Sequence, residues 1–311
     1  MQTPTRIDPT TMTDAELGPI YALRREGKLA AAPDEPVYSV AEMMGQARAR
    51  PEAYEVSEWV IEGGYGQLFR FNGTRNCELE LAIAPEARRS GLGTLFVAFL
   101  AEQARAQGCS ILAIPVADER GESFAASLGA RLDNSWHISV LTLPAEVWPV
   151  PVPGYTIRSW QDAAPAELLE SLAASLNAIN DAPHVTGSDP WLYTAEGVRD
   201  SEAKLIARGM QSRVSAVLDD RGEVVGSTWM RVGLTSGSVA RTGNTAVLSA
   251  HRARGLGRWL KAESLTALMA ARPDVSQVRT SNAVTNAAML AVNRAVGFKS
   301  VSTWTNAVID L

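Results

Sequence analysis

Cysteine and histidine are scarce in this chain, and no long apolar run is present. The 311 residues include two cysteines and three histidines, and His137, His184 and His251 form no ligand spacing. A metal centre built from these side chains is therefore not expected. No apolar stretch approaches the length that spans a bilayer, and the polar start of the chain predicts no signal peptide.

Positive charge is also in short supply. The formal net charge is −5 at pH 7, so a polyanion would be repelled overall, and neither a nucleic acid nor a membrane is an expected partner. Cys77 and Cys109 lie in apolar, strand-like stretches, which predicts buried free thiols in a reducing compartment and hence a cytoplasmic protein. A chain with 46% hydrophobic residues and this length suits two domains, as a monomer or homodimer.

A short glycine-rich pattern is present twice. Residues 88–93 are Arg-Arg-Ser-Gly-Leu-Gly and residues 252–257 are Arg-Ala-Arg-Gly-Leu-Gly, at an offset of 252 − 88 = 164 residues. Each copy follows a strand-like apolar stretch and precedes a helix-like one. A glycine-rich turn in that place aims several backbone N–H groups at one point, and the helix N-terminus adds partial positive charge. Such a cradle suits a pyrophosphate.

A second similarity keeps the two halves in register. Gly129 matches Gly297 at an offset of 297 − 129 = 168 residues, so the halves differ by a short insertion. Repetition with this long a period predicts two small domains rather than a solenoid. The prolines at 144, 149, 151 and 153 exclude a helix or a central strand and predict a linker. The expected organisation is a domain at 1–145, a linker at 146–154 and a domain at 155–311.

With Arg-x-x-Gly-x-Gly after a strand in both halves, and Gly297-Phe298 downstream, the chain resembles the GNAT superfamily of N-acetyltransferases. Its organisation is similar to that of tandem members such as mycothiol synthase. The resemblance implies an α/β (α+β) fold of two tandem domains, each a mixed, mostly antiparallel splayed sheet flanked by helices. It also implies acetyl-CoA (coenzyme A) as cofactor, and acetyl transfer to a primary amine of a small molecule or peptide by direct attack in a ternary complex.

The resemblance assigns cofactor contacts to both halves, at the cradles and at the ends of the strands before them. These residues are Ile83, Ala84, Arg88, Arg89, Ser90, Gly91, Leu92, Gly93 and Thr94 in the first half, and Val247, Leu248, Arg252, Arg254, Gly255, Leu256, Gly257 and Arg258 in the second. Asn286 is similar to the family's asparagine whose amide bonds the pantetheine arm, and Asn282, in the motif Asn-Ala-x-x-Asn-x-x-Met shared with similar tandem acetyltransferases, is a further expected cofactor contact. In the first half Asp118 and Ala125 depart from that pattern. The second half is therefore expected to be catalytic, and the first to be structural or a degenerate cofactor site.

Asp181, His184 and Asn293 are the candidate catalytic residues. The first two lie in a polar segment that this fold would place over the thioester, where a carboxylate or imidazole can accept the proton of the amine. Asn293 stands where many relatives carry a tyrosine that protonates the leaving thiolate, which an amide cannot do. Simpler roles remain open: Asp181 as a turn residue before Pro183, His184 as an exposed loop residue, and the asparagines as helix caps.

Two alternative functions fit the same residues. One is a non-catalytic acyl-CoA-binding protein that regulates a partner, which the missing tyrosine in both halves favours. The other is acetylation of a protein N-terminus or lysine, which a broad acidic groove would favour. The residues identify neither the acceptor amine nor the length of the acyl chain.

Overall fold

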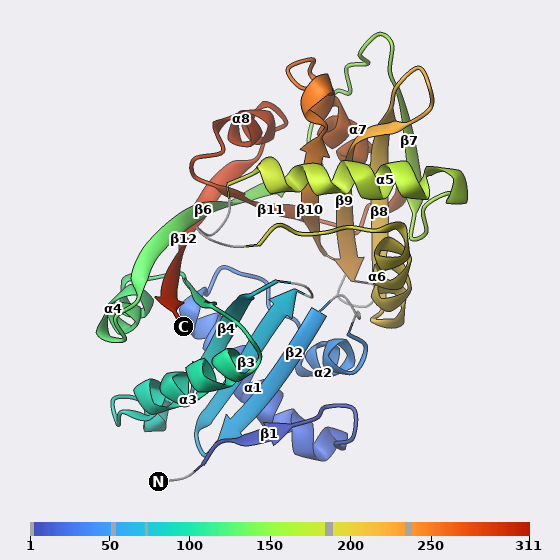
Figure 1. Ribbon diagram of the computed structural model, residues 1–311. Coiled ribbons are helices and arrows are strands. Elements are labelled where there is room, and N and C mark those ends of the chain that lie inside the picture. The colour runs from blue at the N-terminus through green and yellow to red at the C-terminus, as the bar shows by residue number, and fades with distance from the viewer. Residues whose placement is uncertain (1–2, 51–53, 72–73, 184–188, 234–237) are drawn as a thin grey trace. The chain divides into compact units, whose positions relative to one another are not determined.

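The computed structural model describes residues 3–50, 54–71, 74–183, 189–233 and 238–311, which form two compact units (Figure 1). Unit 1 contains the described residues up to Asn134, Asp189 and the C-terminal stretch Trp304–Leu311. Unit 2 contains residues 135–183, 190–233 and 238–303. Among the described residues, no helix is both long and apolar enough to cross a membrane.

Unit 1 is a mixed sheet with helices on both faces. Its strands, in order across the sheet, are β1 (Thr5–Ile7), β2 (Tyr54–Ile61), β3 (Gly64–Phe71), β4 (Asn76–Ile83), β5 (Ile111–Val116) and the end of β12 (Lys299–Asp310). Its helices are α1 (Asp14–Ala31), α2 (Val40–Arg48), α3 (Leu92–Ala106) and α4 (Glu119–Ser127). Neighbouring strands are antiparallel except β4 and β5, which are parallel.

Local sequence explains how these elements form. Thr13 and Ser39 each begin a helix with a capping box, in which the hydroxyl accepts the N3 N–H and the N3 glutamate reaches back to the cap. Helices α1 and α3 cover opposite faces of the sheet (Figure 1). The alternation along β4 serves both faces, because Leu79 packs in the core that includes α3 and Glu80 pairs with Arg24 of α1.

Unit 2 has the same architecture. Its strands, in order, are β6 (Arg131–Thr142), β11 (Gln277–Ala283), β10 (Val239–Val247), β9 (Val224–Gly233), β8 (Met210–Leu218) and β7 (Thr156–Gln161). Its helices are α5 (Leu169–Leu176), α6 (Ala195–Ala207), α7 (Leu256–Ala271) and α8 (Ala287–Ala295). Helices α5 and α7 cover opposite faces of the sheet (Figure 1). Only β10 and β11 are parallel among the strand pairs described in this unit.

The last strand of each half of the chain belongs to the sheet that is built mainly from the other half. Strand β6 comes from the first half but pairs with β11 of unit 2, and β12 comes from the second half but pairs with β5 of unit 1. The compact units therefore do not coincide with the expected domains at 1–145 and 155–311. A strand's own residues predict its extended conformation but not its neighbour, because sheet edges of the same kind offer equivalent hydrogen bonds.

The proline-rich residues expected as a linker, 146–154, pack on unit 2. Val147 is buried in the same core cluster as Leu141 and Leu265, and Val152 packs against the cluster that contains Leu256. Trp148 between them is exposed. This segment is therefore an ordered part of the unit 2 surface.

Cys77 and Cys109 form a disulfide in the buried core of unit 1, so the prediction of free thiols is wrong. Cys77 lies on β4, and Cys109 lies just before β5. Because these two strands are parallel neighbours, the Cα atoms of the cysteines come within 6.1 Å of each other. The contact joins residues 32 apart in the chain, and the spacing alone does not reveal it.

Candidate functional site

In each unit, two parallel neighbouring strands separate in front of the cradle. Strand β4 pairs with β5 from Asn76 to Glu78, and β10 pairs with β11 from Val239 to Arg241; the described pairing ends there. The second half of each strand then has a neighbour on one side only. Backbone groups that face such a gap can hydrogen-bond an extended ligand arm as an added strand would.

The hydrogen-bond pattern identifies the residues that face the gap. The N–H of Ala84 donates to the carbonyl of the residue before β3 (2.9 Å), and that of Leu248 donates to a carbonyl of β9 (2.8 Å). Antiparallel pairs alternate between bonded and non-bonded positions, so Ile83 and Val247 turn their backbone groups toward the gap. Of the predicted strand residues, Ile83 and Val247 thus line the gap, whereas the N–H groups of Ala84 and Leu248 are already in use.

The two cradles have matching backbone geometry. The φ angles of Arg89 and Gly91 are 60° and 84°, and those of Ala253 and Gly255 are 60° and 85°. Such left-handed residues within a turn direct successive N–H groups toward one point, as in anion-binding nests. Gly91 and Gly255 are also the N-caps of α3 and α7, so each helix N-terminus faces that point. Both turns therefore have the backbone geometry that suits a pyrophosphate.

The side chains of the cradles divide into two groups. Arg88 Nε donates to the Ile83 carbonyl at 3.0 Å, and Arg252 Nε donates to the Val247 carbonyl at 2.8 Å, so each first arginine fixes the end of its strand. Three further arginines are exposed and form no ion pair with any described residue: Arg89, Arg254 and Arg258. Cations at a helix N-terminus oppose the helix dipole, so a bound anion would stabilise this arrangement.

The remaining predicted cradle residues lie just before α3 or in the first turns of α3 and α7. The Ser90 hydroxyl donates to the Ala87 carbonyl at 2.7 Å, and this hydrogen bond closes the turn that precedes α3. The others lie at the start of α3 or α7: Leu92, Gly93 and Thr94 in the first unit, and Leu256 and Gly257 in the second.

Strand β10 has a bulge that β4 lacks. The register between β9 and β10 shifts between Thr242 and Thr245, whereas the register between β3 and β4 is continuous. Gly243 lies in the bulge, where a Cβ atom would approach the indole of Trp229 to 2.0 Å. Glycine is therefore required at this position. A bulge leaves a residue out of the ladder and re-aims the backbone that follows, which here leads to Val247 at the gap.

The space beside the cradle helix also differs between the units. A Cβ atom at Gly93 would lie 3.2 Å from the ring of Phe124 on α4. At Gly257, the equivalent position at the offset of 164, the nearest atom belongs to Val292 on α8 at 3.9 Å. Val292 is also the counterpart of Phe124 at the offset of 168. The second cradle is therefore more open on this side than the first.

The asparagines of α8 hydrogen-bond mainly to the protein itself. The side chain of Asn286 caps α8 by accepting the N–H of Met289 at 3.1 Å. Asn293 is 2% exposed and donates to Asn282 at 2.5 Å, while its own oxygen has no hydrogen-bond partner among the described residues. Asp118, the counterpart of Asn286, caps α4 in the same way. The capping role therefore applies at Asn286, and Asn293 presents an unpaired buried acceptor.

Asp181 lies beside the second cradle. It ends the 3₁₀ helix Asn177–Asp181 and forms an ion pair with Arg252 at 2.5 Å. The two side chains are 55% and 43% exposed, so solvent and a ligand can reach both. The pair joins the polar segment to the strand end at β10. His184 lies outside the described residues.

Tyr193 is a candidate that sequence reasoning missed. Its hydroxyl accepts a hydrogen bond from Asn244 at 3.1 Å, next to the bulge of β10. Asn177 and Asn180 hold the segment in place by hydrogen bonds to the backbone of Tyr193 and Trp191. The only signal in the sequence is an aromatic residue after a polar stretch, which does not predict a site by itself.

In unit 1, Glu80 occupies the position equivalent to Asn244. Arg24 donates to both carboxylate oxygens at 2.8 Å, and Lys28 lies 2.9 Å away. Burial alone would raise the pKa of Glu80, but the hydrogen bonds and charges of Arg24 and Lys28 outweigh it and lower the pKa to about 2. A carboxylate that is ionised and paired in this way is a poor proton acceptor near neutral pH.

A second buried polar cluster is built around Glu58 on β2 of unit 1. Glu58 is 1% exposed, and it accepts hydrogen bonds from Tyr21 at 2.8 Å and Tyr65 at 3.0 Å. Arg50 forms an ion pair with it at 2.5 Å. Arg24 stacks over the rings of both tyrosines, so this cluster adjoins the Glu80 ion pair. Beneath α1, unit 1 is thus packed by its own charged and phenolic side chains.

Comparison with known proteins identifies the architecture. The acetyltransferase (GNAT) family model matches residues 20–129, which lie within the first half of the chain. None of the curated proteins compared with the chain matches it. A tandem GNAT protein from the clavulanic acid biosynthesis pathway is similar over 100% of this chain and 98% of its own, with a TM-score of 0.81 and 24% identity.

Two further solved structures have the same fold. A GCN5-related N-acetyltransferase from Sphaerobacter thermophilus covers 100% of this chain and 98% of its own, with a TM-score of 0.71 and 17% identity. A GCN5-related glucosamine N-acetyltransferase region of a fungal multi-domain GH3 β-N-acetylglucosaminidase covers 99% of this chain and 38% of its own, with a TM-score of 0.67 and 13% identity. The predicted tandem fold of mixed, mostly antiparallel sheets flanked by helices is confirmed.

Proposed function

We propose that the chain is a tandem GNAT-type acetyltransferase and that its second domain acetylates a primary amine of a small molecule or peptide. Acyl-CoA-dependent acetyl transfer in general follows from the family. The acceptor class, direct attack in a ternary complex and the choice of domain are the proposal. The observation that carries the proposal is the geometry of strand β10. This strand has a bulge, separates from β11 and is followed by a complete cradle.

The residues of the second cradle fit acetyl-CoA, which would supply the acetyl thioester. The nest at Ala253 and Gly255 and the N-terminus of α7 would hold the pyrophosphate, with the exposed Arg254 and Arg258 as counter-charges. The backbone of Val247 would pair with the pantetheine arm. A fixed N–H donor that faces the gap can hold the acyl oxygen, and one such donor is often worth about 3 kcal/mol of barrier.

Asp181 is the proposed acceptor-side residue. Its carboxylate stands beside the strand end, where it can hold an incoming ammonium and then receive its proton directly or through water. Its ion pair with Arg252 supports a second role, in which Asp181 only positions an arginine of the cradle. The two roles differ in their effect, since the first lowers the acetylation rate and the second lowers the affinity for acetyl-CoA.

The first domain is proposed to be structural or a degenerate cofactor site. Phe124 packs on its cradle helix, β4 has no bulge, and Glu80 is neutralised by Arg24 and Lys28. The family model nevertheless matches this half. A match of this kind reports the order of residue types along the chain, whereas the packing of Phe124 depends on how α4 lies against α3.

The test is a thiol-release screen of the full chain with acetyl-CoA against a panel of small amines and peptides, run on wild type, Gly255→Val and Gly91→Val. We expect turnover with at least one primary amine, loss of turnover in Gly255→Val, and little change in Gly91→Val. Equal loss from both changes would contradict the assignment of catalysis to the second domain. Selective turnover of protein N-termini or lysines would instead favour a protein acetyltransferase.

A non-catalytic acyl-CoA-binding protein is the second candidate. It is favoured by one observation, namely that Asn293 is buried against Asn282 where a proton-donating phenol is absent. Acetyl-CoA binding without thiol release for any amine in the panel would support it.

A cytoplasmic location is also part of the proposal, although a disulfide such as Cys77–Cys109 is uncommon in that compartment. Thiol titration of protein isolated under acid quench would decide this point.

A further inference from the structure

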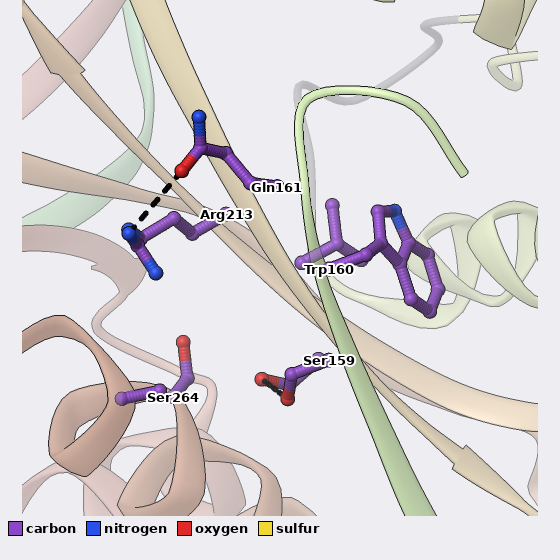
Figure 2. Close-up of a pocket in the computed structure, with 8 residues that line it drawn as sticks. Ser159, Trp160, Gln161, Arg213 and Ser264 are labelled. Carbon is purple, nitrogen blue, oxygen red and sulfur yellow. Dashed lines mark hydrogen bonds between the residues drawn. The ribbon is translucent and has the colours of Figure 1, made fainter. Parts of the chain in front are cut away.

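A polar cavity lies at the β7 edge of the unit 2 sheet. It has a volume of about 250 Å³ and lies between β7, β8 and α7. Its polar lining comes from Ser159, Gln161, Arg213, Ser215 and Ser264 (Figure 2). Strand β9 separates these strands from β10, so the cavity is distinct from the proposed acetyl-CoA site.

Unit 1 fills the corresponding space with large apolar side chains. Val217, Gly226 and Val247 are opposite one another across β8, β9 and β10, as Ile61, Gly64 and Ile83 are across β2, β3 and β4. Counting back two residues along β8 and β2 makes Ser215 the counterpart of Trp59. The offset of 164 makes Ser264 the counterpart of Leu100. Trp59 and Leu100 are 3% and 0% exposed within one core cluster.

The cavity is therefore the space left where a tryptophan and a leucine are replaced by two serines. Ser215 and Ser264 are 2% and 3% exposed, so the serines are buried although they are polar. The hydroxyl of Ser215 bonds to Ser159 at 2.8 Å, while that of Ser264 makes no hydrogen bond with any described residue. The Ser264 hydroxyl is not among the fully buried, unpartnered side-chain atoms of the described residues, so it opens into the cavity, where a bound group can pair with it.

Arg213 supplies the charge at this site. Its guanidinium donates only to the amide oxygens of Gln161 and Gln211, both at 3.3 Å, and no carboxylate among the described residues pairs with it. Figure 2 shows Arg213, Ser264 and Ser159 on one side of β7, with the indole of Trp160 turned to the other side. None of the described lining residues is acidic. The carboxylate of Asp162 accepts a hydrogen bond from the Gln161 amide at 3.0 Å but forms no ion pair with Arg213. The cavity therefore presents one positive charge without a direct carboxylate partner among the described residues, and several hydroxyl groups.

We propose that this cavity binds a small monocarboxylate through Arg213 and the serine hydroxyls. A guanidinium fork matches the two oxygens of a carboxylate, and the hydroxyls of Ser159 and Ser264 can donate to the same oxygens or to a further polar group. One guanidinium balances a single negative charge, so a monoanion matches this cavity better than a dianion. The volume corresponds to about eight water molecules, which sets the ligand at a few heavy atoms.

The test is calorimetric titration of the full chain with acetate and with pyruvate, with inorganic phosphate and glycerol as comparison ligands. We expect saturable binding of at least one carboxylate in the millimolar range or tighter. Arg213→Gln should weaken this binding at least about tenfold, which is about 1.4 kcal/mol. Ser264→Leu, which introduces the residue used in unit 1, should abolish it.

Arg221→Gln is the matched control, because Arg221 is an exposed turn residue of the same unit. It should leave carboxylate binding unchanged, and acetyl-CoA binding should be the same in all variants, which verifies the fold independently of turnover. The proposal is overturned if neither carboxylate binds saturably, if Arg213→Gln binds as wild type does, or if phosphate binds more tightly than both carboxylates. None of these outcomes depends on whether the second domain acetylates amines.

Discussion

The buried side chain of Lys261 should make the stability of unit 2 depend on pH between about 7 and about 10. Lys261 lies on α7 and is 2% exposed. Its ammonium lies 5.4 Å from the centre of the Phe298 ring and has no acidic partner among the described residues. At the offset of 164, unit 1 has Val97 in this position, buried at 2%. Unit 2 thus holds an amine where its repeat holds a hydrocarbon.

The size of the effect follows from the pKa. Burial lowers the pKa of Lys261 to about 7, from 10.5 for an exposed lysine. Between these values the unfolded chain binds a proton that the folded chain has released, so stability rises with pH. At about 1.36 kcal/mol per pH unit, the penalty is about 4 kcal/mol near pH 7 and about 1 kcal/mol near pH 9.5. Below pH 7 it approaches a constant of about 5 kcal/mol.

The assay is urea unfolding of wild type and Lys261→Met at about pH 7 and about pH 9.5. The variant keeps the length of the side chain and removes the titrating group. Its advantage in unfolding free energy over wild type should shrink by about 3 kcal/mol between the two pH values. Lys299→Met, which makes the same exchange at an exposed position of unit 2, should show no such change.

The reasoning would be refuted by an advantage that is the same at both pH values. It would be refuted equally by a Lys261→Met protein that is less stable than wild type near pH 7 and whose deficit in unfolding free energy does not grow at about pH 9.5. Either result would mean that Lys261 keeps its charge in the folded protein through an interaction absent from this structure.

Three further outcomes are expected. Gly255→Val should abolish acetyl-CoA binding to the second domain in calorimetry while circular dichroism stays unchanged, because φ is +85° there, which L side chains rarely adopt, and the added side chain would obstruct the approach of the pyrophosphate to the cradle backbone. Phe124→Val should open the first cradle and raise the acetyl-CoA stoichiometry from one to two per chain; an unchanged stoichiometry would show that Phe124 does not obstruct it. Asp181→Asn should lower the rate at subsaturating amine at least about tenfold, roughly 1.4 kcal/mol. A weaker affinity for acetyl-CoA with an unchanged rate would leave Asp181 only as the partner of Arg252.

The parts of the site that are built by residues close together in the sequence were predictable. Gly91 and Gly255 adopt positive φ angles and cap their helices, as the glycine pattern indicates, because a turn between strand and helix is built within a few residues. The comparison of the two halves also predicted Asp118 as a departure from Asn286, and both cap a helix here. Asp181 was selected from its segment alone, but its ion pair with Arg252 could not be foreseen.

Other features depend on which side chains meet across the fold. Trp59 and Ser215 look unrelated in the chain, and only the strand registers identify them as counterparts, one filling the core and the other lining a cavity. Phe124 gains its role from the way α4 lies against α3, and Tyr193 from its contact with Asn244 on a different strand. No local pattern contains these distances, because each joins residues that are brought together by packing.

The sequence by itself determined that the chain holds two copies of one fold, where each cradle lies and where the helices that follow begin. These features are set by glycine geometry, capping and hydrophobic periodicity, which act over a few residues. Only the tertiary structure decided that β6 and β12 join the sheets of the other units, that Cys77 meets Cys109, and that Lys261 is buried without an acidic partner among the described residues. Strand pairing and burial depend on competing long-range contacts, and the winner is set by the packing of the whole unit rather than by any one segment.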